Sequence, residues 1–151
     1  MNTPTPSVSR SRKLEKADYE ALAAFRRALR RFLHHSDEGA RQAGVTPQQH
    51  QLLLAIKGQR GRDWASITDL ADALQVRHHA AVGLVDRSER SGLVRRTTDP
   101  EDGRQVRVVL TEAGEEVLDH LSQWNRQELA TLRRALDLSF LEEELADPVS
   151  D

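Results

Sequence analysis

Two short helical segments separated by a tight turn occupy the middle of the chain, in the stretch SITDLADALQVRHHAAVGLVDRSERSGLV. Thr68 is expected to cap the first segment, which carries apolar residues at helical spacing. The second segment is expected to run from about His78 to Ser91, where Gly92 ends it. Two short helices that meet at a tight turn form a helix-turn-helix, although many other helical hairpins share this pattern.

The second of these helices has two distinct faces. A buried face is predicted from residues at i, i+3, i+4 and i+7, namely Ala81, Leu84, Val85 and Ser88. The opposite face carries His78, His79, Val82, Gly83 and Asp86. If the first set packs on a core, the second set is left free to contact a partner.

A β-hairpin is predicted directly after the second helix. Residues 93–98 and 105–110 are predicted as two strands, and in the second Val106, Val108 and Leu110 alternate with Arg107 and Val109. Between them, DPEDG supplies the Pro, Asp and Gly residues that tight turns favour. Arg104 follows this turn, two residues after Asp102, so a positive charge is expected near the tip of the hairpin. A hairpin after a helix-turn-helix is a wing, and the predicted fold is therefore mainly α with a small β wing.

Longer amphipathic helices are predicted on both sides of this central part. Residues 16–35 place Leu22, Phe25 and Leu29 on one stripe, which favours a packed core face but is also compatible with a subunit interface. A second stripe, which includes Trp124 and Leu132, predicts a long helix that reaches about residue 136.

Capping signals mark where several helices begin. Thr46, Pro47 and Gln49 provide a cap, a first-turn proline and a capping box for a helix over 47–57. Thr111 is expected to cap the long helix that follows the hairpin. A second capping box, Ser139 with Glu142, predicts a short final turn.

The composition argues against several classes of function. The chain has no cysteine, which excludes disulfides, thiolate metal sites and thiol redox sensing. His78 and His79 are adjacent, and adjacent side chains on a helix point about 100° apart, so no metal site is predicted. No nucleophile–base pattern or phosphate-binding glycine loop is present, and we predict neither an enzyme nor a bound cofactor. Apolar runs are only a few residues long and the N-terminus has no apolar h-region, so we expect no membrane span and a cytoplasmic protein.

Charge is distributed unevenly along the 151 residues, although the net charge is only −2. Residues 1–35 carry eight basic and three acidic groups, and residues 111–151 carry three basic and eleven acidic groups. An anionic partner is therefore expected to avoid the C-terminal end, and the two ends have charges that are compatible with packing together.

The order of elements and three local motifs resemble the MarR (multiple antibiotic resistance regulator) family of winged-helix transcription factors, over about residues 16–136. The motifs are LADAL at 70–74, LVDRSERSGLV at 84–94 and, most specifically, DPEDGRQVRVVLTEAG at 99–114. The resemblance implies a dimer that binds DNA, with the second helix of the helix-turn-helix in the major groove and the wing in the minor groove. One departure is Ser88, which stands where the family usually has a large apolar residue.

If the chain binds DNA, specific contacts are expected from the residues of the helix-turn-helix. Arg77, His78 and His79 begin the helix that enters the major groove, where each can donate to phosphate or to a base acceptor. Val82 is expected to touch a thymine methyl group, and Gly83 to permit close approach. Thr68 is expected to meet a phosphate.

The predicted wing carries further DNA contacts. A minor groove narrowed by A·T-rich sequence attracts a guanidinium, which makes Arg104 the leading candidate. The resemblance implies that Asp102 orients Arg104, and a charge-assisted bond between the two would serve that purpose. The alternative is an ordinary ion pair between Asp102 and Arg104 on the surface of the hairpin, without a role in DNA binding. Arg95 and Arg96 open the wing strand and are expected to contact phosphates, or else to form a solvated strand end.

These expectations give a domain plan. It consists of a flexible tail at 1–12, a dimerisation helix at 13–40, a winged helix-turn-helix at 44–110 and C-terminal dimerisation helices at 111–146, all in one structural unit. The predicted dimer interface comprises Leu22, Phe25, Leu29, Trp124 and Leu132. The predicted function is that of a homodimeric repressor on a palindromic double-stranded DNA operator. The resemblance suggests release by a small organic effector, aromatic or phenolic, in the crevice between the dimer helices and the DNA-binding part. The alternative is a winged helix that binds another protein and no DNA.

Overall fold

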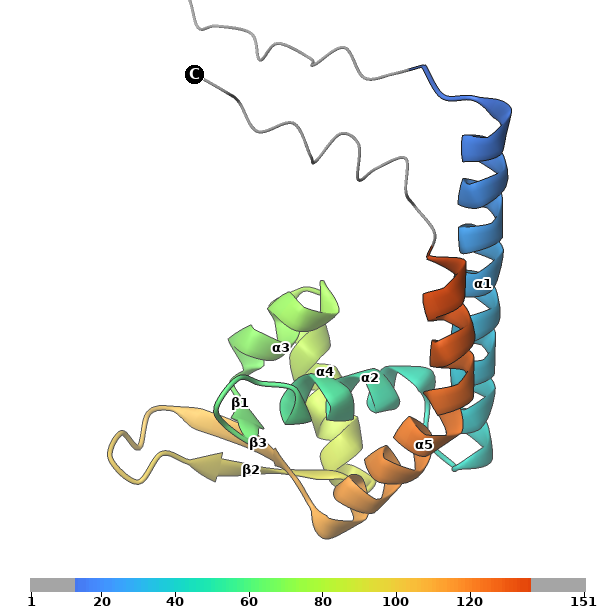
Figure 1. The fold of residues 1–151 in the computed structure, drawn as a ribbon. Helices are drawn as coiled ribbons and strands as arrows, with labels where there is room; N and C mark the ends of the chain where they lie inside the picture. The colour runs from blue at the N-terminus through green and yellow to red at the C-terminus, as the bar shows by residue number, and fades with distance from the viewer. Residues whose placement is uncertain (1–12, 137–151) are drawn as a thin grey trace, which may run out of the picture. The chain divides into compact units, whose positions relative to one another are not determined.

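The structure is a computed structural model that describes residues 13–136. Within these residues the elements follow the predicted order (Figure 1). They are α1 (Lys16–Gln42), α2 (Pro47–Lys57), β1 (Trp64–Ala65), α3 (Ile67–Leu74), α4 (His78–Arg90), β2 (Val94–Thr98), β3 (Val106–Leu110) and α5 (Glu112–Ala135). The predicted tail at 1–12 and the final turn at Ser139 lie outside the described residues.

The contacts divide the described chain into two compact units. The larger unit comprises residues 33–127, and the smaller comprises residues 13–32 together with 128–136. The domain boundaries expected from the sequence stay a prediction.

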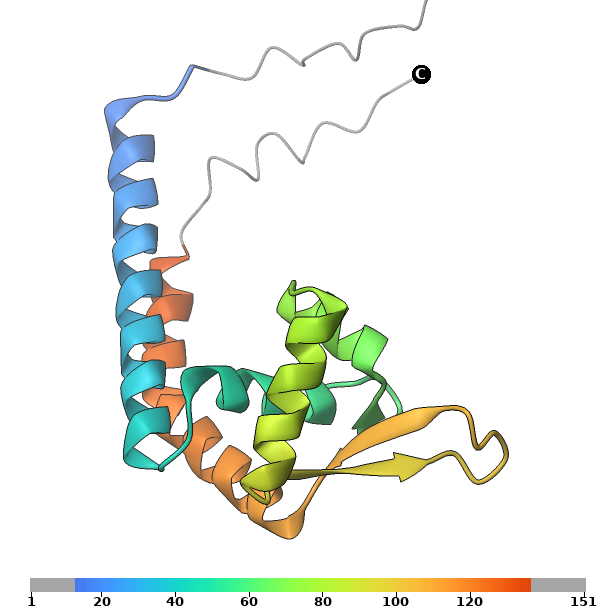
Figure 2. The same ribbon diagram turned by 180° about the vertical axis from the view of Figure 1, so that it is seen from behind.

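The helix-turn-helix is confirmed as α3 and α4. Gln75 ends α3 in the left-handed region with a φ of 52°, and the next amide, from Val76, donates to the carbonyl of Ala71 at 3.0 Å. This closes the chain into the tight turn expected at QVR. Helix α4 then runs to Arg90 and leads into β2 at the base of the hairpin (Figure 2).

The wing is also confirmed, with one strand more than the sequence predicted. Strands β2 and β3 pair antiparallel over their whole length, from Val94 opposite Leu110 to Thr98 opposite Val106. Strand β1 pairs with the other edge of β3, which gives the order β1-β3-β2. At two residues, β1 is too short for the alternation by which a strand is recognised in sequence.

The core of the larger unit lies between α2, α4, the inner face of the sheet and α5. Burial of apolar surface is the main force that holds these elements together. The fully buried side chains include Leu52, Leu53 and Ile56 of α2, Leu70 of α3, Val85 of α4, Val94 and Val108 of the sheet, and Leu121 of α5. The buried face predicted for α4 is confirmed at all four positions.

In the smaller unit, the first half of α1 packs beside the end of α5. The apolar stripe of α1 is half-buried at Leu22, Phe25 and Leu29, and Leu132 of α5 is half-buried as well. Arg31 of α1 lies 3.5 Å from Glu128 of α5, which ties the two segments by an ion pair. Tyr19 and Leu129 remain exposed in the single chain.

Two local predictions were wrong. Ser66, not Thr68, caps α3, because Ser66 and Asp69 form a reciprocal capping box with bonds of 3.1 and 2.8 Å. Thr68 has Ala71 three residues later, which cannot return such a bond. Helix α1 ends at Gln42 and not at 35, shortly before Gly44, whose φ of 79° favours glycine.

Ser88 is a polar exception in the core. Its side chain is fully buried, and its hydroxyl has no hydrogen-bond partner among the described residues. An unpaired buried hydroxyl is costly, and alanine is the better helix former. We therefore expect Ser88→Ala to raise the free energy of unfolding by about 1 kcal/mol, measured as a higher urea midpoint. The control is Ser122→Ala on α5, whose hydroxyl donates to the Leu118 carbonyl at 2.7 Å and which should bring no gain.

His50 is expected to make the stability of the fold depend on pH. This α2 side chain is buried, and loss of solvent lowers its pKa, although nearby Asp37 acts in the opposite direction. The unfolded chain therefore binds this proton more readily than the folded chain does. Stability should fall as the pH drops below about 6.5. His50→Gln should lessen this fall in unfolding curves measured from pH 7.5 to 5.5. His120→Gln, at an exposed position, should follow the wild-type profile, and identical profiles for all three proteins would refute the assignment.

Candidate nucleic-acid interface

The start of α4 presents three exposed side chains. Arg77 occupies the N-cap position with extended backbone, and its side chain makes no capping bond to the helix. His78 and His79 follow it and are exposed as well. The amide groups of the first turn also give this end of the helix a partial positive charge. The structure thus brings together the residues predicted to enter the major groove, while their contact with DNA stays a prediction.

Gly83 leaves room for an arginine that the sequence reasoning missed. A Cβ atom on Gly83 would lie 3.3 Å from Nη1 of Arg87, so the Arg87 side chain lies back along α4 over the glycine. Val82 and Gly83 are themselves half-exposed. The sequence could have indicated this contact, because Gly83 and Arg87 are four residues apart and such residues share a helix face.

Arg87 also borders an open groove between α2 and α4. The groove has a volume of about 310 Å³. Its lining combines the Arg87 guanidinium and the amides of Gln48 and Gln51 with the apolar side chains of Leu74 and Leu84. A cation beside apolar surface suits a small amphipathic anion.

The wing loop, residues 99–105, is ordered by its own carboxylates. Asp99 accepts a hydrogen bond from the Glu101 amide at 2.9 Å, and Asp102 accepts one from the Arg104 amide at 3.0 Å. The predicted charge-assisted bond from Asp102 to the Arg104 guanidinium is not seen. Asp102 binds the backbone of Arg104 instead, because a carboxylate two residues before an amide closes a tight turn most easily.

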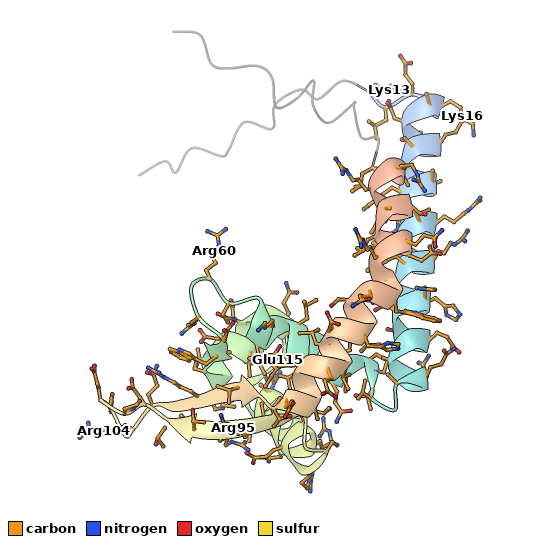
Figure 3. The ribbon with its side chains drawn as sticks, turned by 60° about the horizontal axis from the view of Figure 1, so that its bottom comes forward. Lys13, Lys16, Arg60, Arg95, Arg104 and Glu115 are labelled. Atoms are coloured by element: carbon orange, nitrogen blue, oxygen red, sulfur yellow. The ribbon has the colours of Figure 1, made fainter. Side chains whose placement is uncertain are left out.

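Arg104 therefore keeps its charge available. It is exposed at the far end of the hairpin (Figure 3), and its guanidinium has no ion-pair partner among the described residues. Arg95 lies nearer the base of the hairpin. It is also exposed, and its guanidinium has no ion-pair partner among the described residues.

Arg96 has a different environment from the one expected. It lies on the inner face of the sheet, where its guanidinium donates to Asp86 at 2.7 Å and to Glu89 at 2.9 Å. Burial lowers the pKa of Arg96, but the bonds to the two carboxylates outweigh this and raise it. Arg96 therefore neutralises two acids of α4 and fixes β2 to that helix. Because this guanidinium is already paired with two carboxylates, Arg96 is less suited than Arg95 to contact a phosphate.

The sequence reasoning also missed a cluster at the base of the wing. The guanidinium groups of Arg62 and Arg107 both lie 4.1 Å from the centre of the Trp64 ring. Arg62 precedes β1 and Arg107 belongs to β3, so the contact depends on a strand pairing that local sequence does not reveal.

Trp124, predicted at the dimer interface, makes contacts within its own chain. Its ring stacks on His35 with centroids 4.8 Å apart, and its indole N–H donates to the His35 carbonyl at 3.1 Å. A Cβ on Gly39 would overlap the ring, so the glycine admits the tryptophan. Trp124 is still 37% exposed, which leaves part of the ring for a second contact.

Two further observations concern residues 13–136 alone. No group of three or more acidic or histidine side chains there comes together as a metal site. None of the helices in that range combines the length and the apolar character needed to cross a membrane.

The helix-turn-helix, the three-stranded sheet and the wing together define a winged helix-turn-helix protein. Residues 43–105 match the sequence model of the MarR family. AbsC, a MarR family transcriptional regulator from Streptomyces coelicolor, superposes with a TM-score of 0.62 at 25% identity, covering 89% of this chain and 93% of AbsC. A MepR mutant from S. aureus, bound to an oligodeoxyribonucleotide, gives 0.59 at 25% identity, covering 85% and 91%.

One relative extends the comparison in sequence. The transcriptional activatory protein BadR of Rhodopseudomonas palustris is 35% identical over 92 residues, which are 60% of this chain. The match covers 53% of BadR, so the chain spans about half the length of that relative. The chain is thus similar to the MarR family over residues 43–105, and AbsC and BadR are named as transcriptional regulators.

Proposed function

We propose that the chain is a sequence-specific transcriptional regulator that binds double-stranded DNA. The observation that carries the proposal is the wing-tip Arg104, an exposed guanidinium that has no partner within residues 13–136 and lies on a loop held by carboxylate–amide bonds. A cation presented in this way is suited to the negative potential of a narrow minor groove. The MepR mutant, which shares the fold at 25% identity, was solved bound to an oligodeoxyribonucleotide.

The exposed start of α4 supplies the second DNA contact. Arg77, His78 and His79 are donors to phosphates and to guanine N7 or O6 in the major groove. Val82 and Gly83 lie further along the same helix and face a thymine methyl group or the edge of a base. Thr68, exposed in the first turn of α3, and Arg95 on β2 contact phosphates and set the register without reading sequence.

We further propose a homodimer. The apolar residues Leu22, Phe25, Leu29 and Leu132 are only half-buried in the single chain, and Tyr19 and Leu129 are exposed beside them. A second copy would cover this surface and remove more apolar area from water. A dimer would present two recognition helices to a palindromic operator.

A small aromatic acid is the effector class that the groove beside α4 fits best. The Arg87 guanidinium would pair with its carboxylate, and Leu74 and Leu84 would contact its ring. Phenolic acids should raise the melting temperature of the wild-type protein and not of Arg87→Ala. A panel that moves neither the melting temperature nor the DNA affinity would exclude this class.

The sign of regulation is a finer question. Release from DNA by an effector favours repression, whereas BadR is named as an activatory protein. A reporter fused to the bound promoter decides between repression and activation.

Hydroxyl-radical footprinting on the DNA upstream of the gene tests the proposal. The expected result is two protected half-sites about 10 base pairs apart, as two recognition helices related by a two-fold axis require. A single protected half-site would contradict the dimer. Absence of protection at every concentration would contradict DNA binding and would fit a winged helix that binds another protein.

A further inference from the structure

Five side chains at the base of the wing form a continuous row of contacts. Asp69 lies 2.8 Å from Arg62, and Arg62 stacks at 4.1 Å on one side of the row's central ring, Trp64. Arg107 lies at the same distance from the ring and makes an ion pair of 2.9 Å with Asp99. We call this row the Trp64 brace. It runs from the first turn of α3 to the beginning of the wing loop.

The strand register explains why these residues meet. Trp64 pairs with Val109 of β3, and Arg107 lies two residues away from Val109 on the same face of the sheet. Trp64 and Arg107 are therefore diagonal neighbours on adjacent strands, a separation that long side chains span. The other face of the sheet packs on the core through Ala65 and Val108.

Both ends of the brace are fixed to backbone. The pKa of Asp69 is lowered chiefly by the amide of Ser66, its partner in the capping box of α3, with a further contribution from Arg62. The pKa of Asp99 is lowered chiefly by the amide of Glu101 in the wing loop, with a further contribution from Arg107. Each carboxylate thus joins an arginine of the brace to a turn of main chain.

The wing needs such support beyond β1. Strand β1 covers only Val108 and Val109 of β3, so the rest of the hairpin and the wing loop extend as two strands. A two-stranded hairpin by itself is only marginally stable in water. The contact between Arg107 and Asp99 lies in this unsupported part and reaches the loop that carries Arg104.

We propose that Trp64 is a positioning residue for DNA binding, because the brace holds the wing loop and its tip arginine in a fixed direction relative to the helix-turn-helix. The inference rests on the proposed DNA-binding function for its biological meaning. The claim that Trp64 holds the wing can be tested on the protein without DNA. Without the brace, Arg104 would have to be ordered upon binding, which weakens the complex.

Hydrogen exchange of the free protein tests whether Trp64 holds the wing. In Trp64→Leu, the amides of Glu101 and Arg104 should exchange about ten times faster, while the amides of α4 stay protected. Trp64→Tyr, which keeps an aromatic face for the arginines, should restore most of the protection. Unchanged exchange at the wing amides in Trp64→Leu would overturn the proposal, as would equal acceleration in α4.

Two arginines of one loop provide a matched control. Arg60 and Arg62 both lie between α2 and β1, but Arg60 is exposed at the tip of the loop (Figure 3) and makes no contact with the ring. Arg62→Ala should accelerate exchange in the wing loop and Arg60→Ala should not. Equal effects of the two substitutions would show that the stack is not what holds the wing.

A double-mutant cycle then connects the brace to DNA. Trp64→Leu should weaken binding to the upstream duplex about tenfold, and it should add little to the loss in Arg104→Ala, because the brace acts through that arginine. Losses that add in full would mean that Trp64 stabilises the fold without positioning the wing tip. If the wild-type protein binds no DNA, the proposed function fails, and the exchange experiment still decides the brace.

Discussion

Replacing Gly114 with alanine is expected to destabilise the larger unit by about 3 kcal/mol. Gly114 lies in the first turn of α5 and is buried, and a Cβ atom there would overlap the carbonyl oxygen of Leu93. That oxygen already accepts a hydrogen bond from the Thr111 amide at 3.0 Å, so neither backbone can move away without breaking the junction between the sheet and α5. The loss should appear as a lower midpoint in urea unfolding.

The wing supplies a control for this substitution. Gly103 has open space around the position of a Cβ atom, and its φ lies outside the left-handed region. Gly103→Ala should therefore change the free energy of unfolding by less than about 0.5 kcal/mol. A Gly114→Ala protein with the wild-type midpoint would show that α5 does not approach the sheet as closely as described.

Removing the wing-tip charge is expected to weaken DNA binding by about 1–3 kcal/mol, or roughly 5- to 150-fold in the dissociation constant. Arg104→Ala deletes an exposed guanidinium that has no intramolecular ion pair among the described residues, so the fold should be unaffected. The loss should be larger on an A·T-rich site, where the minor groove is narrow. Affinities are to be measured by fluorescence anisotropy at constant salt.

Arg126→Ala controls for the change in net charge. Arg126 is exposed on α5, and its loss alters the charge of the protein equally. It should leave the affinity within about twofold of wild type, since charges beyond a Debye length are screened. Equal losses in the two variants would mean that general electrostatic attraction, and not a contact by the wing tip, accounts for binding.

Local signals in the sequence were sufficient to predict most of the helices. The capping box of Thr46 and Gln49 is formed as expected, and Thr111 caps α5 through the amide of Gly114 at 3.1 Å. Such signals involve residues three apart, so the chain contains the whole interaction within one turn. Helix α3 could have been capped by Ser66 or by Thr68. Ser66 is the cap, because Asp69 lies three residues later and bonds back to the Ser66 amide.

The parts that could not be predicted depend on residues far apart in the sequence. Strand β1 exists because Trp64 and Ala65 meet β3, and neither residue has a periodic pattern around it. Arg96 resembled an exposed phosphate contact until the sheet placed it beside Asp86 and Glu89 of α4. The direction of an arginine side chain depends on the carboxylates that the fold brings near it. Those contacts involve other elements and cannot be predicted from the neighbouring residues in the sequence.

The most direct test of DNA recognition by this winged helix is a titration of the wild-type protein into its own upstream duplex, repeated at several salt concentrations. A shuffled duplex of the same composition serves as the control. We predict tight binding to the upstream duplex, with the logarithm of the association constant falling linearly with the logarithm of salt concentration, and binding to the shuffled duplex weaker by about a thousandfold or more. Equal affinity for the two duplexes, or no dependence on salt, would contradict the account.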